Sequence, residues 1–500
     1  MRSAGAAVSL NLDSLEEPDL HSSNPITQFF RIAQTPNLEE LNLSHSKLDS
    51  ASPAVIENLD SLEKLELCFC QLTESPLRIA SLPNLNELNL SNSKMDCASS
   101  VLIENLASLK KLDMRCCKLT QSSLRIATIS ELKQLDLSGS EIQSAGSVVI
   151  ENLDSLEKLD MRTCNLTKSS FRLASLRNLK RLSLFHSVPD SASSVIIENV
   201  DALEKLDMVD CNLTNSSLRF VSLTKLTELD VSRSELDSDL LTGIDQLLLL
   251  EKLNLAFCDL TKLPFRFDSL INLRELDISH NKLHSDSIVG IDNLALLETL
   301  NLSSCDATKP PFKFDSLPKL KELDVSYNKF DCDSHVDIGK LVFLEKLNLH
   351  FCNLRKLPFR FDSLNNLKEL DVGENKLASE FFNDIEKLVS LRKLNLSCCE
   401  LTKLPFCFDS LTKLKELKVS GNKLDSGSLA GIDKIALLET LNLSSCDLTK
   451  LPFSSRSHVA SLAASYSATY FASAVDTATI LCDLLNQLTG VGSCMNTNPG

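Results

Sequence analysis

The chain has 500 residues, 43% of them hydrophobic, and a formal net charge of −16 at pH 7. This charge argues against nucleic acid and anionic membranes as partners and favours a basic protein partner. The sequence holds no run of about 20 apolar residues that could span a bilayer, and its apolar start lacks a secretory cleavage pattern.

Residues 1–37 are predicted to form a degenerate repeat. The segment LEEPDLHSSNP, residues 15–25, keeps the register of the rest of the chain, because Leu15 lies 23 residues before Leu38. Pro18 and Pro25 stand where leucines recur in the later repeats. The N-terminus is therefore interpreted as repeat material and not as a targeting segment.

Residues 38–453 form a regular array. A signature of eleven residues recurs eighteen times, from LEELNLSHSKL at residues 38–48 to LETLNLSSCDL at residues 438–448, with spacings that alternate between 24 and 23 residues. Leucines at positions one, four, six and eleven are predicted to point inward, and positions three, five and seven outward, which is the period of a strand. One short strand per repeat predicts a parallel sheet.

The segments that return the chain from one signature to the next are of two kinds. Odd repeats carry a longer return with helical spacing, such as SLAGIDKIALL at residues 428–438. Even repeats carry LPFRFDSL, in which proline is expected to fix a turn and phenylalanine to fill the interior. The Asn or Ser at position nine is expected to hydrogen-bond backbone groups as the chain leaves the strand.

Nine of the 17 cysteines occupy position nine of alternate repeats: Cys70, Cys117, Cys164, Cys211, Cys258, Cys305, Cys352, Cys399 and Cys446. Thiols two coils apart would be separated by about 10 Å, which is too far for a disulfide. We predict that they are small, buried, reduced core residues.

These motifs resemble those of leucine-rich repeat proteins, and the signature LxxLxLxx(N/C)xL covers most of the chain. The turn LPxxFxSLxxL is similar to that of the typical cytoplasmic class, which includes Ras-pathway scaffolds and regulatory subunits of Ser/Thr phosphatases. The resemblance implies an α/β solenoid shaped as a curved horseshoe, with one short parallel strand per repeat and short helical or irregular convex segments. It also implies a cytoplasmic protein that binds other proteins on its concave sheet.

The outward positions are dominated by charge. Position three alternates Glu with Lys, so neighbouring strands are expected to pair these side chains, stabilising the sheet by about 0.2–1 kcal/mol for each pair. Position five is a stripe of Asp and Asn, which could accept Arg or Lys side chains of a partner. The alternative is a solvated polar ladder.

Large side chains gather at positions seven and eight. Exposed aromatic rings with polar surroundings are typical of interface hot spots. We therefore predict a contact patch in repeats ten to fourteen, formed by Phe257, Asp277, His280, Asp324, Tyr327, His350 and Phe351. The alternative is that the rings fold back as a second small core.

No Ser-His-Asp, Cys-His or glycine-rich phosphate arrangement occurs at a usable spacing, and we predict neither catalysis nor a metal or cofactor. The predicted function is a protein-interaction scaffold in intracellular signalling. The alternatives are a regulatory subunit of an enzyme, such as a phosphatase or GTPase-pathway component, and a receptor-type recognition protein. Residues 454–500 leave the repeat pattern and are expected to form a helical cap, a disordered tail or the end of a truncated array.

Overall fold

The computed structural model describes most of the repeat array. The described residues are 8–9, 30–32, 37–46, 55–72, 78–95, 102–103, 106–119, 129–141, 148–164, 171–187, 195–213, 218–236, 239–309, 316–330, 338, 340–355, 364–377, 385–404, 408–446 and 448. The tail at 454–500 lies outside them, as does most of the degenerate repeat at 1–37. The predictions for those two segments are therefore not addressed by the structure.

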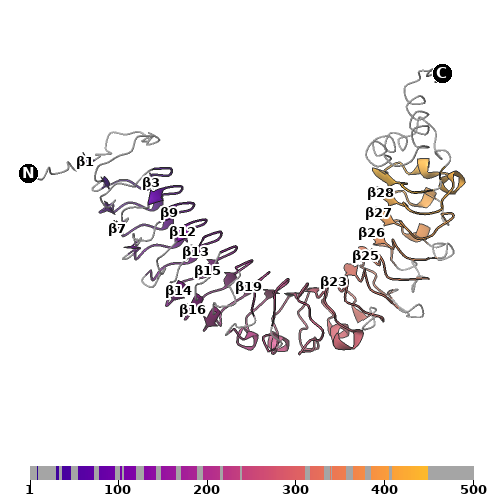
Figure 1. The fold of residues 1–500 in the computed structure, drawn as a ribbon, viewed down its shortest axis with the longest axis horizontal. Coiled ribbons are helices and arrows are strands. Elements are labelled where there is room, and N and C mark those ends of the chain that lie inside the picture. Colours follow the sequence, from indigo (N-terminus) through magenta and orange to yellow (C-terminus); the bar gives the residue numbers. More distant parts are fainter. Residues whose placement is uncertain are drawn as a thin grey trace, which may run out of the picture. The chain divides into compact units, whose positions relative to one another are not determined.

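The chain divides into two compact units, Met1–Cys258 and Asp259–Gly500. In unit 1, one three-residue strand from each described repeat joins a parallel sheet (Figure 1). In sheet order the strands are β3 (Glu40–Asn42), β5 (Lys64–Glu66), β8 (Glu87–Asn89), β11 (Lys111–Asp113), β13 (Gln134–Asp136), β15 (Lys158–Asp160), β17 (Arg181–Ser183), β19 (Lys205–Asp207), β20 (Glu228–Asp230) and β21 (Lys252–Asn254).

Unit 2 contains a sheet of the same kind, again with parallel neighbours. Its strands are β22 (Glu275–Asp277), β23 (Thr299–Asn301), β24 (Glu322–Asp324), β25 (Lys346–Asn348), β26 (Glu369–Asp371), β27 (Lys393–Asn395), β28 (Glu416–Lys418) and β29 (Thr440–Asn442). Each strand spans positions three to five of a signature, as the leucine spacing predicts.

The leucines of the signature form the core. At position four, Leu65 and Leu417 are fully buried, while both of their strand neighbours are partly exposed. We call that outward surface, which carries positions three, five and seven, the strand face. The predicted inward position four and outward positions three and five are thus confirmed, whereas several small residues at position seven, such as Ser279 and Ser326, are buried.

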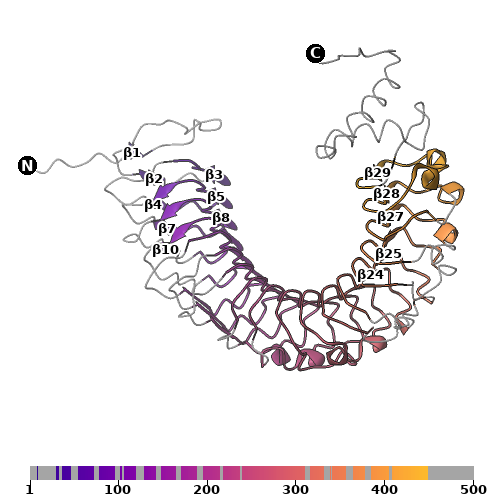
Figure 2. The ribbon, with the colours of Figure 1, turned by 45° about the vertical axis from the view of Figure 1, so that its right-hand side comes forward.

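The return segments differ from the prediction in unit 1. They form short parallel strands there, and Figure 2 shows β4, β7 and β10 on the side opposite β3, β5 and β8. These return strands are β1 (Val8–Ser9), β2 (Phe30–Ile32), β4 (Val55–Glu57), β7 (Arg78–Ala80), β10 (Leu102–Ile103), β14 (Val148–Glu151), β16 (Phe171–Ala174) and β18 (Val195–Glu198). In β4, β14 and β18, runs of Val and Ile explain the difference, because β-branched residues favour strands over helices. Three shorter strands, β6 (Gln71–Leu72), β9 (Lys94–Met95) and β12 (Lys118–Leu119), form just after position nine.

From residue 220 onward, the described return segments instead contain single turns of 3-10 helix. They are η2 (Phe220–Ser222), η3 (Ile244–Gln246), η4 (Ser285–Ser287), η5 (Ile291–Asn293), η9 (Ile385–Lys387), η10 (Phe408–Ser410), η11 (Ser426–Leu429) and η12 (Ile432–Lys434). The helical spacing at residues 428–438 thus corresponds to a 3-10 turn that starts after Gly431, whose φ is 90°. A 3-10 helix rises about 2.0 Å per residue, so it covers a short return with fewer residues than an α-helix.

Position nine holds each coil to the previous one. The buried Asn375 accepts from the backbone N–H groups of Cys352 and Leu354 at 3.0 and 2.9 Å, and donates to the carbonyl of Leu349 at 2.8 Å. Asn328 and Asn422 repeat this arrangement, and Ser93 and Ser140 play the same part in unit 1. The predicted role of position nine in hydrogen bonding is confirmed.

The thiols on this ladder are free. The Cys352 Sγ, for example, donates to the carbonyl of Val325 at 3.2 Å, and burial raises the pKa of this thiol to about 12. All but Cys446, which is half-buried, are buried. They are core residues, as predicted.

Candidate protein-binding surface

Ion pairs cover position three of the strand face. Lys205 lies 2.6 Å from Glu228, Lys346 lies 2.7 Å from Glu322 and Lys393 lies 3.0 Å from Glu369, in each case on adjacent strands. The predicted alternation is confirmed. Because these pairs are solvent-exposed, each contributes only about 0–1 kcal/mol, but a charged partner that docked there would have to displace them.

Position five in unit 2 is a series of Asp–Asn pairs. The amide groups of Asn301, Asn348 and Asn395 donate to Asp277, Asp324 and Asp371 at 3.0, 2.8 and 2.9 Å. Each of these carboxylates also accepts the backbone N–H two residues further on, at 2.9 Å. The Asp stripe is therefore held in place by neighbouring coils.

Position eight has a backbone conformation that the sequence did not predict. All eighteen residues there, the non-glycine ones included, have φ between 52° and 69°. This left-handed turn lets the backbone N–H of position eight continue the ladder, as in Tyr327 to the His350 carbonyl at 2.8 Å, while the chain turns position nine into the core. For a bulky side chain this conformation costs about 1 kcal/mol of conformational free energy, whereas Gly adopts it without that cost. The signal was present in the sequence, since Gly139 and Gly421 occupy this position.

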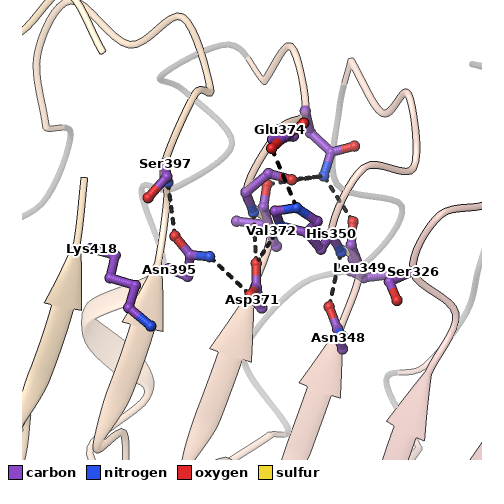
Figure 3. Close-up of polar contacts among 12 residues, drawn as sticks. Ser326, Asn348, Leu349, His350, Asp371, Val372, Glu374, Asn395, Ser397 and Lys418 are labelled. Atoms are coloured by element: carbon purple, nitrogen blue, oxygen red, sulfur yellow. Dashed lines mark hydrogen bonds and ion pairs between the residues drawn. The ribbon is translucent and has the colours of Figure 1, made fainter. Parts of the chain in front are cut away.

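Several groups in unit 2 surround His350, the one histidine at position seven (Figure 3). Its Nδ1 atom lies 3.2 Å from Oδ1 of Asp371, and its Nε2 atom lies 3.6 Å from Oε1 of Glu374. Its ring centroid lies 5.3 Å from that of Tyr327, which in turn lies 5.7 Å from that of Phe351. We call Asp324, Tyr327, His350, Phe351, Asp371 and Glu374 the His350 cluster.

The charges in this cluster favour the imidazolium form of His350. The hydrogen bond with Asp371 raises the pKa of His350, and the charges of Asp371, Glu374 and Asp324 add to that rise against the effect of burial. Burial by itself would raise the pKa of Asp371, but hydrogen bonds from His350, Asn395 and the Gly373 N–H outweigh it and lower that pKa. The pair is therefore an ion pair below the pKa of His350.

The aromatic rings of the cluster are half exposed. The exposed fraction is 53% for Tyr327 and 45% for Phe351. Both residues have left-handed φ values, of 57° and 52°. Such exposure does not fit the alternative in which these rings form a second small core. It leaves two adjacent rings exposed next to His350, at the edge of the strand face.

The structure brings together four of the seven residues predicted for the contact patch: Asp324, Tyr327, His350 and Phe351. Asp277 and the backbone of His280 belong to the β22 coil of the same unit, where the His280 N–H donates to the Ser303 carbonyl at 2.8 Å. Phe257 belongs to unit 1, where the Arg233 guanidinium lies 4.8 Å from its ring centroid.

Sequence reasoning missed Asp371, Gly373 and Glu374 as members of this site. Asp371 was recognised only as part of the position-five stripe. Gly373 is the single glycine at position seven, and that was the available signal. A Cβ atom on Gly373 would lie 2.8 Å from the His350 Nδ1, so the missing side chain makes room for the imidazole.

Family models of the leucine-rich repeat match residues 37–59, 272–294 and 389–448. Each match falls on the strand and return pattern described above. The chain is a leucine-rich repeat protein. No curated protein sequence matches this leucine-rich repeat chain.

Solved structures share the fold. A leucine-rich repeat protein of Leptospira interrogans is 27% identical, with a TM-score of 0.56, and the match covers 69% of this chain and 86% of that one. The ectodomain of the receptor kinase GASSHO1/SCHENGEN3 from Arabidopsis thaliana, in complex with CASPARIAN STRIP INTEGRITY FACTOR 2, is 18% identical with a TM-score of 0.50, covering 85% and 63%. The plant peptide hormone receptor RGFR1, in complex with RGF2, is 18% identical with a TM-score of 0.50, covering 82% and 75%.

The leucine-rich repeat fold supports protein interaction in general, and its members are typically non-catalytic. Within the described part of this leucine-rich repeat protein, no group of three or more His, Cys, Asp or Glu side chains could hold a metal ion. None of the helices among those residues is long and apolar enough to cross a bilayer.

Proposed function

We propose that this protein is a non-catalytic scaffold that binds a protein partner through the strand face of unit 2, at the His350 cluster. The observation that carries the proposal is the pair of adjacent, half-exposed rings, Tyr327 and Phe351. They lie next to His350, which contacts Asp371 and Glu374. Two adjacent, exposed aromatic rings are the kind of surface that interface hot spots use.

The surroundings of the rings support a protein interface. Ser326 and Gly373 at position seven are small and buried, so neither places a bulky side chain beside the exposed rings. Interface hot spots combine central aromatic side chains with a polar rim, and here the rim is formed by Asp324, Asp371 and Glu374. A polypeptide segment would fit this surface better than a small molecule, which favours an enclosed pocket.

We also place this scaffold in the cytoplasm, in intracellular signalling. The buried thiols of the ladder serve as hydrogen-bond donors to carbonyls, a use of cysteine that suits a reducing compartment. The cytoplasmic location can be tested by counting alkylated thiols. The protein is isolated from its source under denaturing conditions and without added reductant. Disulfides on the ladder cysteines would count against it.

The central test is affinity capture from the source cell with the wild-type chain and with a Tyr327→Ala/Phe351→Ala double variant. We expect the double variant to lose the main partner by at least tenfold in recovered amount, because truncating a hot-spot ring costs about 2 kcal/mol or more. The identity of that partner also distinguishes a phosphatase or GTPase regulator from other scaffolds.

The matched control is Phe69→Ala, which removes an equally exposed ring at position eight of unit 1, where it stacks on His45. Binding should survive this change. Equal recovery with the double variant, at unchanged thermal stability, would exclude the His350 cluster as the docking site.

A further inference from the structure

If the proposed function holds, the His350 cluster also indicates the kind of partner that it accepts. The His350 imidazole lies between two carboxylates, with Nδ1 3.2 Å from Asp371 and Nε2 3.6 Å from Glu374, and its ring contacts Tyr327. When His350 is protonated, its planar imidazolium lies between carboxylates at both edges, with the Tyr327 ring nearby.

We propose that the His350 cluster binds a basic segment of a partner protein, whose Arg or Lys side chain takes the place of the His350 imidazolium between Asp371 and Glu374. This inference rests on the proposed function. The apolar part of that segment would lie on the exposed rings of Tyr327 and Phe351. Binding would then be an exchange of one cation for another and would release a proton from His350.

The chemistry of the site favours a cation in this position. A guanidinium donates to carboxylates in a fork and stacks on aromatic faces, and both partners are provided here. The chain as a whole carries a net charge of −16, which would attract a basic segment from solution. Glu374 is well suited to the exchange because its side chain is 45% exposed and its contact with His350 is long.

Exchange is favoured over simple addition because of the groups that face His350. Asp371 and Glu374 face it from β26 and its exit, and Asp324 and Tyr327 lie on the β24 side. A second cation placed beside a protonated imidazole would be repelled by it. The incoming side chain must therefore meet a neutral or displaced His350.

A measurable consequence is a proton-linked affinity. Because Asp371 raises the pKa of His350, the imidazolium competes with the incoming cation over a wider pH range than an ordinary histidine would. Release of one proton makes the affinity rise by up to tenfold for each pH unit below that pKa and level off above it. A docking site of fixed charge would show no such slope.

The test uses the full chain and a capped Arg-Leu-Arg-Leu-Arg pentapeptide, with the same peptide carrying citrulline for arginine as its neutral match. Peptide affinity is measured between pH 5 and 8.5, and the pKa of His350 is followed by NMR. We expect the wild type to bind the arginine peptide more tightly as the pH rises. The affinity of His350→Gln for the same peptide should not change with pH. Binding of the peptide to the wild type should lower the pKa of His350. The citrulline peptide should bind at least tenfold more weakly.

Two charge variants separate a local effect from general attraction. Glu374→Gln should weaken the arginine peptide several-fold, whereas Asp409→Asn, which removes one negative charge from η10 on a return segment, should leave its affinity unchanged. Equal losses in the two variants, or the same pH slope in His350→Gln as in the wild type, would overturn the cation exchange.

The two experiments distinguish failure of the cation exchange from failure of the proposed docking surface. If the Tyr327→Ala/Phe351→Ala variant loses its captured partner but the arginine peptide does not bind, the docking surface holds and the basic partner is wrong. If the captured partner does not depend on the rings, the docking surface itself is wrong, whatever the peptide does.

Discussion

His350 depends on the absence of a side chain at Gly373. A Cβ atom on Gly373 would lie 2.8 Å from the His350 Nδ1, which is closer than the two atoms can pack. The ring of His350 can move, so a Gly373→Ala change should displace the imidazole from Asp371 without unfolding the coil.

The expected result of Gly373→Ala is a fall in the pKa of His350, because the hydrogen bond with Asp371 is the largest cause of its rise. NMR titration of the histidine resonances, assigned with His350→Gln, measures it. Gly427→Ala is the matched control, since a Cβ there would meet Asp425 at an ordinary 3.5 Å. An unchanged His350 pKa in Gly373→Ala would show that the glycine does not set the position of the ring.

A second prediction concerns the left-handed residues at position eight. Asn adopts this conformation more readily than Phe, so Phe351→Asn should raise the free energy of unfolding by up to about 1 kcal/mol while weakening partner capture. Thr163→Asn, at φ 55° in unit 1, should stabilise the chain similarly and leave capture unchanged. Urea denaturation of the three proteins measures the stability. A loss of stability in Phe351→Asn would mean that the ring supports the fold after all.

A third prediction concerns the asparagine ladder. Asn375→Ala removes the acceptor of two backbone N–H groups and the donor to two or more carbonyls in the interior, so we expect a loss of about 2–4 kcal/mol in unfolding free energy. The exposed Asn366, which donates to the Val342 carbonyl at 2.8 Å, provides the control. Its replacement by Ala should cost less than about 1 kcal/mol. Similar losses for the two variants would contradict a special role for position nine.

Those parts of the fold that depend on the period of the repeat could be predicted from the sequence. Leucine spacing indicated the inward positions, and the alternation of Glu with Lys indicated pairs such as Lys346 with Glu322. Periodicity did not predict the return strands of unit 1, because a run such as Val195–Glu198 is short and its Val and Ile residues fit either a strand or a buried turn. The short length of the segment and its pairing with the neighbouring return strand made it a strand.

The candidate site was predicted only in part, for a similar reason. Tyr327, His350 and Phe351 were recognisable as departures from the repeat. The contribution of Gly373 was not, because the effect of a missing side chain becomes visible only when the neighbouring coil is in place. Phe257 was grouped with the others by repeat number, whereas the structure assigns it to the other unit.

The last prediction is the pH dependence of stability due to His350 and Asp371. The pKa of His350 is raised above its usual 6.5, so its stabilising contribution is complete below pH 6.5 and is lost as the pH rises through the folded pKa. The pKa of Asp371 is lowered below its usual 3.8, so its contribution is present above pH 3.8 and is lost as the pH falls through the folded pKa. Both contributions are complete only between these values.

The difference in unfolding free energy between the wild type and His350→Gln should therefore be largest between pH 3.8 and 6.5 and should shrink at higher pH. We expect a pH-dependent part of about 1 kcal/mol or less, because solvent reaches both side chains. In an Asp371→Asn background, the same His350→Gln change should lose most of this dependence, which a double-mutant cycle in urea at several pH values measures. If the dependence persists there, the partner that holds the proton on His350 is Glu374 and not Asp371.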